Sequence, residues 1–437
     1  MTCVHDHPAQ DQSAAAAGRT LKLLVLDTSY TLEMIRARGL EHSVTCRDLG
    51  GFFEHVWTVH PFATLLTSDD WSPRYGRPVE HTLSSTHTFV EGRIGRYGAL
   101  ARFFLLNFLL SQANLFFSLA RLIRKESIAA IRAGDPLYLG VFSWALARWC
   151  GIPLVVRVGG NHDKVFATTG RPIQPRLFRH RRIEKMIERF VFKRADLVAG
   201  ANQDNLNFAL TNGARPECST LFRYGNLIDK QHFVDPASRA APDKELRGLG
   251  LERGTFLMYI GRLEPVKQPD HLVRVLAELR SRGHSIKAVL VGDGQLRGAL
   301  LELARELGVE EHIVLAGNRD QCWLSEVIPA AAAVLSPHTG RALSEAALAA
   351  APIVAYDVDW QGEIIETDVT GALVPHNDWR QMADAVHRYL VDRPHARLMG
   401  NAVRRRALEM LDPEALDRHE RQQYLAVIQR LNVAATK

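Results

Sequence analysis

The chain has 437 residues, of which 46% are hydrophobic and 23% are charged. That composition excludes a disordered or fibrous protein, and the length favours two α/β domains of about 200 residues each, with a ligand cleft between them. The formal net charge of +6 suggests an anionic partner such as a nucleotide, a phospholipid surface or nucleic acid. The five cysteines are scattered and odd in number, which argues against a disulfide framework or a zinc site and favours a reducing cytosol.

Residues 1–19 carry no apolar signal region and are predicted to be a disordered lead-in. His5 and His7 within it are a weak candidate for a metal contact. From Leu21 onward, short apolar runs alternate with helical patterns, which is typical of parallel strands buried on both faces of a sheet. In the first half of the chain these runs are residues 21–27, 55–61, 128–135, 153–159 and 197–202.

Two helical stretches in this half suggest a surface partner. Residues 101–125 are strongly apolar with basic ends, and residues 171–194 interleave aromatic with basic side chains. The basic residues of the second stretch include Arg179, Arg181, Arg182, Lys185 and Arg189. One interpretation is contact with a membrane surface; the other is a buried helix followed by a solvated basic face. No run of eighteen uninterrupted apolar residues occurs, so no membrane span is expected.

A polar, proline-containing segment then marks a boundary between two domains. We assign residues 20–235 to an N-terminal Rossmann-like domain, 236–254 to a linker, 255–392 to a second Rossmann-like domain, and 393–437 to charged amphipathic helices that pack back on the first domain. Strands of the second domain are predicted at residues 255–261, 286–292, 312–317, 333–337, 352–357 and 370–375. The fold class is therefore α/β, with two doubly wound domains facing a cleft.

Parallel sheets bind ligands beyond the carboxyl ends of their strands. Gly261 ends the first strand of the second domain and allows a tight turn. Arg262 and Lys267 follow it in the segment GRLEPVKQ. A guanidinium and an ammonium together suit a diphosphate. The alternative is a pair of solvated surface cations.

The pattern of residues 333–357 predicts a strand, a turn at Gly340 and a helix. Free N–H groups of the residues from Gly340 to Leu343 would attract phosphate. Glu345 lies about one turn into the helix, where it either accepts hydrogen bonds from ribose hydroxyls or complements the helix dipole.

These motifs, with LVGDGQLR and GEIIETDVTGALVP, resemble the C-terminal domain of family 4 (group 1) glycosyltransferases of GT-B fold over residues 255–390. The resemblance implies that Arg262 and Lys267 hold the donor diphosphate and that Glu345 binds ribose. It also implies phosphate binding by the turn and base binding by the loop after the third strand. These segments contribute Gly340, Arg341, Ala342, Leu343, Asn318 and Arg319.

The sequence departs from that family at Pro337, which stands where an earlier glutamate usually contacts the donor sugar. Proline has no side-chain acceptor, so His338 or another loop takes the role, the donor sugar differs, or activity is lost. Asp357 and Asp359 form an Asp-x-Asp pair of the kind that holds a divalent cation in the other, single-sheet class of glycosyltransferases. Because Arg262 and Lys267 already neutralise phosphate, we predict no metal and no cofactor, with a nucleotide-sugar as co-substrate.

The N-terminal half resembles the family less closely. Its segment Gly159-Gly160-Asn161-His162-Asp163 lies near the place where relatives carry a histidine that contacts the transferred sugar or acceptor. His162, with Asn161, is therefore the acceptor-side candidate. A lone histidine is otherwise structural or on the surface. In retaining relatives the donor phosphate takes the acceptor proton, so no dedicated base is implied.

The expected function is a retaining, metal-independent hexosyltransferase that uses a saccharide or lipid-linked acceptor in surface glycan, glycolipid or polysaccharide synthesis. We expect a cytoplasmic protein that is peripheral on the inner face of the membrane. Alternatives on the same scaffold are a sugar-nucleotide epimerase or phosphorylase and a catalytically silent scaffold or membrane-surface protein. Nucleic-acid binding is not expected, because no recognition motif or single basic stripe is present.

Overall fold

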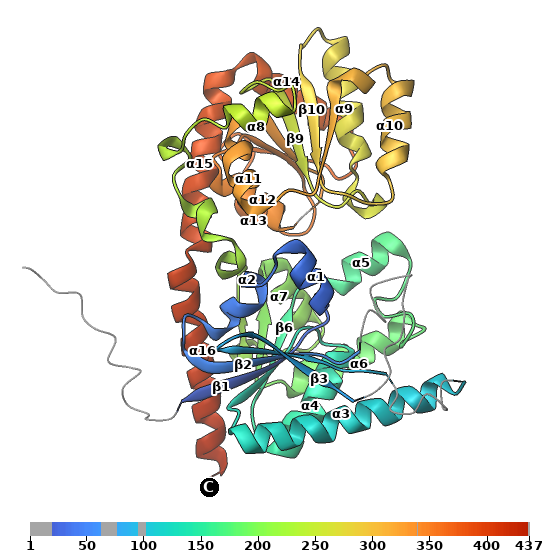
Figure 1. The fold of residues 1–437 in the computed structure, drawn as a ribbon, viewed down its shortest axis with the longest axis vertical. Helices are drawn as coiled ribbons and strands as arrows, with labels where there is room; N and C mark the ends of the chain where they lie inside the picture. The colour runs from blue at the N-terminus through green and yellow to red at the C-terminus, as the bar shows by residue number, and fades with distance from the viewer. Residues whose placement is uncertain (1–19, 63–76, 95–101, 339, 436–437) are drawn as a thin grey trace, which may run out of the picture.

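The computed structural model describes residues 20–62, 77–94, 102–338 and 340–435, so the predicted lead-in with His5 and His7 lies outside the described residues. Figure 1 shows two α/β lobes, one above the other, with a pair of long C-terminal helices along one side of both. Each lobe is built on its own sheet. The predicted α/β class with two Rossmann-like domains is confirmed.

In the part of the chain that the structure describes, the N-terminal sheet has eight strands in the order β3-β4-β2-β1-β5-β6-β7-β8. All neighbouring pairs are parallel except β3 with β4. The strands are β1 (Leu21–Leu26), β2 (Phe53–His60), β3 (Val79–Ser84), β4 (His87–Glu91), β5 (Ala130–Ala133), β6 (Leu154–Val158), β7 (Leu197–Gly200) and β8 (Ser219–Leu221). All five predicted strands are present. The sequence reading missed β3, β4 and β8, because β3 and β8 are only partly buried and lack the continuous apolar run of a central strand.

The helices of this lobe cover both faces of the sheet. They are α1 (Leu32–Arg38), α2 (His42–Thr45), α3 (Phe104–Glu126), α4 (Tyr138–Cys150), α5 (His162–Thr169), α6 (Arg181–Arg194) and α7 (Gln203–Thr211). By length and mean hydropathy alone, residues Leu105–Glu126 of α3 would suffice to cross a membrane. In the fold, however, α3 lies along the domain, and Leu115, Leu119 and Ile123 are buried in its core.

Among the described residues, the C-terminal sheet has six parallel strands in the order β11-β10-β9-β12-β13-β14. The strands are β9 (Phe256–Ile260), β10 (Lys287–Val291), β11 (Ile313–Gly317), β12 (Ala333–Ser336), β13 (Ile353–Tyr356) and β14 (Ala372–Val374). The helices are α8 (Asp243–Gly248), α9 (Asp270–Ser281), α10 (Arg297–Glu306), α11 (Gln321–Val327), α12 (Arg341–Leu348), α13 (Gln361–Ile364) and α14 (Trp379–Val391). Each predicted strand of this domain is present.

The range assigned to a linker, residues 236–254, contains α8, whose Leu246 is buried in the core of the C-terminal lobe together with Leu251. Part of this range therefore stabilises that lobe. The polar composition hid this contribution, because few apolar side chains carry it: Leu246 and Leu251 are buried, and Leu249 packs against the same core.

Helices α15 (Arg393–Leu411) and α16 (Pro413–Ala435) join the two lobes. Helix α15 packs on α12 of the C-terminal lobe, whereas α16 packs on the N-terminal sheet. There the ring of Tyr424 lies 5.1 Å from that of Phe53 and 6.0 Å from that of Phe222, and Glu420 forms an ion pair of 3.1 Å with Arg132. The chain thus returns to its first domain after completing the second.

Candidate functional site

A cavity of about 770 Å³ lies between the carboxyl ends of the two sheets and is lined by residues of both lobes. We call its two sides the N-terminal wall and the C-terminal wall. Of the residues that the structure describes, the charged ones that line it are Asp27, Arg47, Arg132, Asp135, Arg157, Lys164, Lys267, Arg341 and Asp359. Six of these are cationic and three are acidic, so the cavity suits a polyanionic ligand.

Lys267 occupies the C-terminal wall, at the end of the short helical turn Pro265–Lys267 that follows β9. Its Nζ lies 3.0 Å from Nδ1 of His338, which follows β12 and also lines the cavity. Burial, reinforced by the charge of Arg262, lowers the pKa of Lys267 to about 8. A bound diphosphate would reverse this shift, because a nearby anion favours the ammonium form.

Arg262, the second predicted phosphate ligand, does not line the cavity. Its side chain is 58% exposed, and Nη1 forms an ion pair of 2.8 Å with Oε1 of Glu264. The preceding turn is close-packed: a Cβ on Gly261 would meet the Tyr259 hydroxyl at 2.9 Å, and a Cβ on Gly292 would lie 1.9 Å from the Gly261 carbonyl oxygen. Arg262 is therefore an exposed side chain with Glu264 as its counter-ion.

Glu345 lies beneath the cavity wall and does not line it. The side chain is almost fully buried, and Oε1 accepts from Nε of Arg341 at 2.8 Å. With its amide nitrogen turned toward His232, Gln321 also donates to Oε1 of Glu345 at 3.0 Å and accepts from Arg341 Nη2 at 3.0 Å. Arg341 itself lines the cavity and reaches Ser43 of the other lobe, 3.5 Å from its Nη1. Neither Gln321 nor His232 was predicted from the sequence.

Helix α12 begins at the cavity. Gly340 is its N-cap residue, and no side chain among the described residues caps the free N–H groups of the first turn. Gly340, Arg341 and Ser344 line the cavity, whereas Leu343 is buried in the core and Ala342 does not reach the lining. The free N–H groups and the dipole of the helix favour an anion at this end.

The predicted base-binding residues, Asn318 and Arg319, follow β11 and are exposed outside the cavity lining. The Arg319 guanidinium carbon lies 5.2 Å from the centre of the Trp323 ring. Of the Asp-x-Asp pair, Asp359 lines the cavity and Asp357 does not. Among the described residues no three His, Cys, Asp or Glu side chains are grouped so that they could hold a metal ion.

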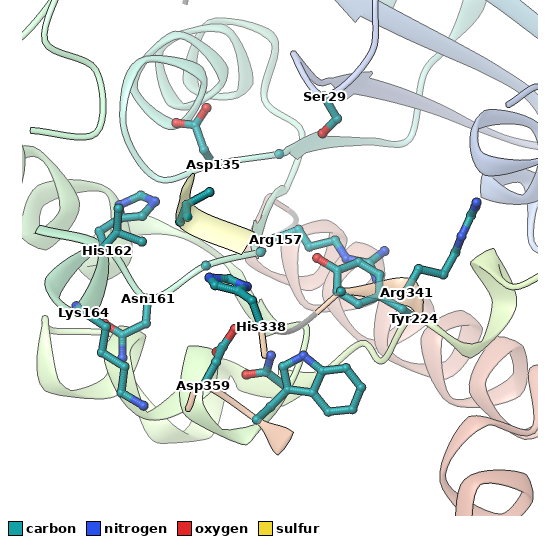
Figure 2. A pocket seen from close by; sticks show the side chains of 18 of the residues that line it. Ser29, Asp135, Arg157, Asn161, His162, Lys164, Tyr224, His338, Arg341 and Asp359 are labelled. Carbon is teal, nitrogen blue, oxygen red and sulfur yellow. The ribbon is translucent and has the colours of Figure 1, made fainter. Parts of the chain in front are cut away.

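His162 is buried in the N-terminal wall as the first residue of α5, and Asn161 caps the helix by accepting from the Lys164 N–H at 3.2 Å. His162 Nδ1 lies 2.7 Å from Oε1 of Glu188. Because a carboxylate only accepts, Nδ1 is the donor. Figure 2 shows His162 and Asn161 together on this wall, with His338 and Asp359 from the other lobe opposite.

Glu188 is fixed in turn by Arg181, whose Nη1 and Nη2 lie 2.7 and 2.8 Å from its two carboxylate oxygens. The sequence reading placed Arg181 on a basic face, but only 7% of this residue is exposed. Helix α6 has basic residues on its solvent side and two buried glutamates on its inner side. That inward face, not the basic face, positions the candidate histidine.

Asp135, which follows β5, was also not predicted as a site residue from the sequence. It lines the cavity, and Oδ1 accepts from the Leu137 N–H at 2.7 Å. Burial raises the pKa of Asp135 to about 6. A carboxyl group that titrates near neutral pH in a ligand cavity is a candidate for proton transfer or for hydrogen bonding to hydroxyls. The sequence signal that could have predicted Asp135 as a site residue is its position after Gly134, at the end of a predicted strand.

Comparison with known proteins gives the family. Residues 243–406 match the family model described as glycosyl transferases group 1. The alpha-D-kanosaminyltransferase of Streptomyces kanamyceticus is 26% identical over 312 residues, which are 69% of this chain and 76% of that protein. A GDP-mannose-dependent alpha-(1-6)-phosphatidylinositol monomannoside mannosyltransferase of Mycobacterium tuberculosis is 32% identical over 189 residues, covering 40% of this chain and 48% of that protein.

The fold is likewise similar to that of a solved structure, Anabaena Alr3699/HepE in complex with UDP and glucose. The TM-score is 0.64 at 17% identity, with 95% of this chain and 99% of that chain covered. The motifs of the second domain, the match to the family model and the two facing Rossmann-like lobes all indicate the same family. The chain belongs to the group 1 (family 4) glycosyltransferases, enzymes of GT-B fold that use nucleotide-sugar donors.

Proposed function

We propose that the protein transfers a sugar from a nucleotide-sugar to a saccharide or lipid-linked acceptor, with retention of configuration and without a metal, in surface glycan, glycolipid or polysaccharide synthesis. The observation that carries the proposal is the cavity itself. Its C-terminal wall presents Lys267, Arg341 and the uncapped start of α12, and its N-terminal wall presents His162 and Asn161.

The C-terminal wall has the chemistry that a departing nucleoside diphosphate requires. Negative charge grows on the leaving phosphate as the glycosidic bond breaks, and fixed N–H dipoles and cations in a closed site stabilise that charge more than they stabilise the bound donor. Lys267 and the α12 N-terminus already face the cavity. Arg262 joins them in this proposal by exchanging Glu264 for a phosphate oxygen when donor binds.

Asp359 is our candidate for the carboxylate that Pro337 cannot supply. It lines the cavity, its charge raises the pKa of Lys267, and it holds a left-handed backbone conformation with φ of 59°. That conformation is uncommon for a residue other than glycine and is often retained at functional sites. We propose that Asp359 and His338 together bind hydroxyls of the donor sugar.

A panel of UDP-, GDP- and ADP-sugars, assayed for nucleotide release with and without lipid extract, tests the transferase proposal. Arg262→Ala, Lys267→Ala and Glu345→Ala should each lower turnover, with Lys267→Ala losing on the order of a hundredfold. Arg305→Ala is the control, because Arg305 is an exposed cation of the same lobe paired with Glu310 at 2.9 Å. Wild-type turnover in all three variants would refute the assigned site. No turnover of any donor by the wild type would favour a silent scaffold.

A surface of the N-terminal lobe supports a position at the membrane. Helices α3, α4 and α6 pack side by side and expose apolar side chains among basic ones. The exposed apolar residues are Leu105, Leu106, Leu109, Leu110, Phe117, Trp149, Ile183 and Met186. The exposed basic residues are Arg121, Arg124, Lys125, Arg148, Arg182, Lys185 and Arg189. We call this the α3–α4–α6 face.

We propose that the α3–α4–α6 face rests on an anionic lipid bilayer on the cytoplasmic side. Apolar side chains enter the interface while arginine and lysine bind the lipid phosphates, so apolar area and charge act together. The free thiols of Cys46, Cys150, Cys218 and Cys322 are compatible with that reducing compartment.

Sedimentation with vesicles tests the membrane proposal. The wild type should bind vesicles that contain phosphatidylglycerol and bind phosphatidylcholine vesicles much less. The double variant Leu109→Ser with Phe117→Ser should stay in the supernatant. Leu398→Ser, which alters a residue 66% exposed on α15, should bind as the wild type does. Equal binding by all three proteins would reject the assigned face.

A further inference from the structure

The floor of the N-terminal wall contains a group of buried charges that the donor site does not use. Three guanidinium groups, those of Arg47, Arg132 and Arg157, and the carboxylate of Asp27 all line the cavity. Glu420 of α16 reaches the same group from outside the cavity. Together they carry three positive and two negative charges.

Two of the three guanidinium groups have a carboxylate partner. Arg47 forms an ion pair with Asp27 and donates to the Thr58 hydroxyl at 3.1 Å. Arg132 pairs with Glu420 at 3.1 Å. Burial alone would raise the pKa of Asp27, but Arg47, hydrogen bonds from Ser29 and Arg132 lower it to about 2, so Asp27 remains an anion at neutral pH.

Arg157 differs from the other two. It is the last residue but one of β6 and is only 8% exposed, and no carboxylate of the described residues forms an ion pair with it. Its Nη2 donates to the Phe222 carbonyl oxygen at 2.9 Å, its guanidinium carbon lies 4.9 Å from the centre of the Tyr224 ring, and Nε has no hydrogen-bond partner in the described structure. A buried guanidinium without a counter-ion is unfavourable unless a ligand supplies the anion.

The surroundings leave space for such a ligand. Tyr224 and Gly159 also line the cavity, and the glycine lets the Tyr224 hydroxyl approach closely, because a Cβ on Gly159 would lie 3.0 Å from that oxygen. The hydroxyl-bearing residues Ser29, Tyr30 and Ser43 line the cavity as well. In Figure 2, Arg157 and Tyr224 are separated from His162 and Asn161, so this subsite is distinct from the histidine.

We infer that the acceptor carries an oxyanion, a phosphate or a carboxylate, which binds to Arg157 beside Tyr224 in the N-terminal wall. This inference rests on the proposed transferase function, because it assigns the acceptor to the wall that faces the donor groups. A guanidinium binds either oxyanion through paired N–H donors, which a neutral hydroxyl cannot match. The bound anion completes the charge balance of the floor.

The experiment has two stages, so that failure of the proposed function and failure of this inference can be distinguished. The first stage measures whether UDP, GDP or ADP raises the melting temperature of the protein. If none does, the donor proposal fails at this point. In the second stage the nucleoside diphosphate that binds is kept saturating, so that the donor cations are occupied, and glucose 6-phosphate, glucuronate and glucose are titrated by calorimetry.

The wild type should bind glucose 6-phosphate or glucuronate at least about tenfold more tightly than glucose, which corresponds to one charged contact. Whichever anion binds more tightly identifies the acceptor chemistry. Arg157→Gln should abolish the preference, Arg157→Lys should keep part of it, and Arg194→Gln should leave it unchanged. Arg194 is a suitable control because its guanidinium carbon, on α6 of the same lobe, lies 4.0 Å from the Phe190 ring centre, away from the cavity lining.

Melting temperature without ligand separates a binding role from a structural one. An uncompensated buried charge lowers stability, so Arg157→Met should melt no lower than the wild type while the anion preference is lost. A marked fall in melting temperature together with an intact preference in Arg157→Lys and Arg157→Gln would overturn the inference. So would equal affinities of the wild type for all three sugars.

Discussion

At the residue scale, we predict that Lys267 makes donor binding depend on pH. Burial and Arg262 lower its pKa to about 8, and only the ammonium form attracts a diphosphate. Affinity for a nucleoside diphosphate should therefore fall as the pH rises from about 7 to about 9, and Lys267→Arg should abolish that fall because a guanidinium stays charged. Calorimetric titration at several pH values measures this. A flat wild-type profile would mean that Lys267 does not contact the phosphates.

Glu188 is the second residue whose role can be measured. Glu188→Gln replaces a carboxylate that accepts from both Arg181 and His162. Arg181 then loses one of its three carboxylate partners, keeping Asp163 and Glu184, and the imidazole loses its orientation. The free energy of unfolding should fall by about 1.5–3 kcal/mol, the value of hydrogen bonds to a charged group, and turnover should fall with little change in nucleoside diphosphate affinity. Denaturant unfolding and kinetics report the two effects. Glu310→Gln, at an exposed pair, is the control and should change neither.

At the scale of elements, α16 completes the N-terminal domain although it is last in the chain. Tyr424 is fully buried against Phe53 and Phe222, so Tyr424→Ala should cost about 3–5 kcal/mol of unfolding free energy through the cavity that it creates. Denaturant unfolding measures the loss. Arg418→Ala, which removes an exposed side chain of the same helix, should stay within about 0.5 kcal/mol of the wild type. A small loss at Tyr424 would mean that α16 docks only weakly.

At the scale of the whole molecule, Glu363 of α13 links the two lobes. Its Oε2 accepts from Arg223 Nη1 and its Oε1 from the Gln203 N–H, each at 2.7 Å. Glu363→Gln should weaken the coupling by about 1.5–3 kcal/mol and separate thermal unfolding into two transitions. Calorimetry resolves them. Glu366→Gln, which alters the exposed pair with Arg406 within one lobe, should not separate them, and a single transition in both variants would place the coupling elsewhere.

The sequence alone determined the α/β class, every strand of the second sheet and the positions of Lys267, His338, Arg341 and His162 at strand or helix ends. It could do so because buried parallel strands are continuous apolar runs, and their carboxyl ends meet at one edge of a sheet whatever the remaining contacts are. Local signals therefore specify which residues approach the cavity.

Only the tertiary structure decided what those residues meet there. It placed Glu188 behind His162, Glu345 beneath Arg341, Arg262 on Glu264 and Glu420 beside Arg132. Arg157 looked like one residue of an apolar strand, and its lack of a counter-ion is visible only when β6, β8 and α16 are assembled. Burial and pairing depend on contacts between distant segments, and no local periodicity records which charge remains without a partner.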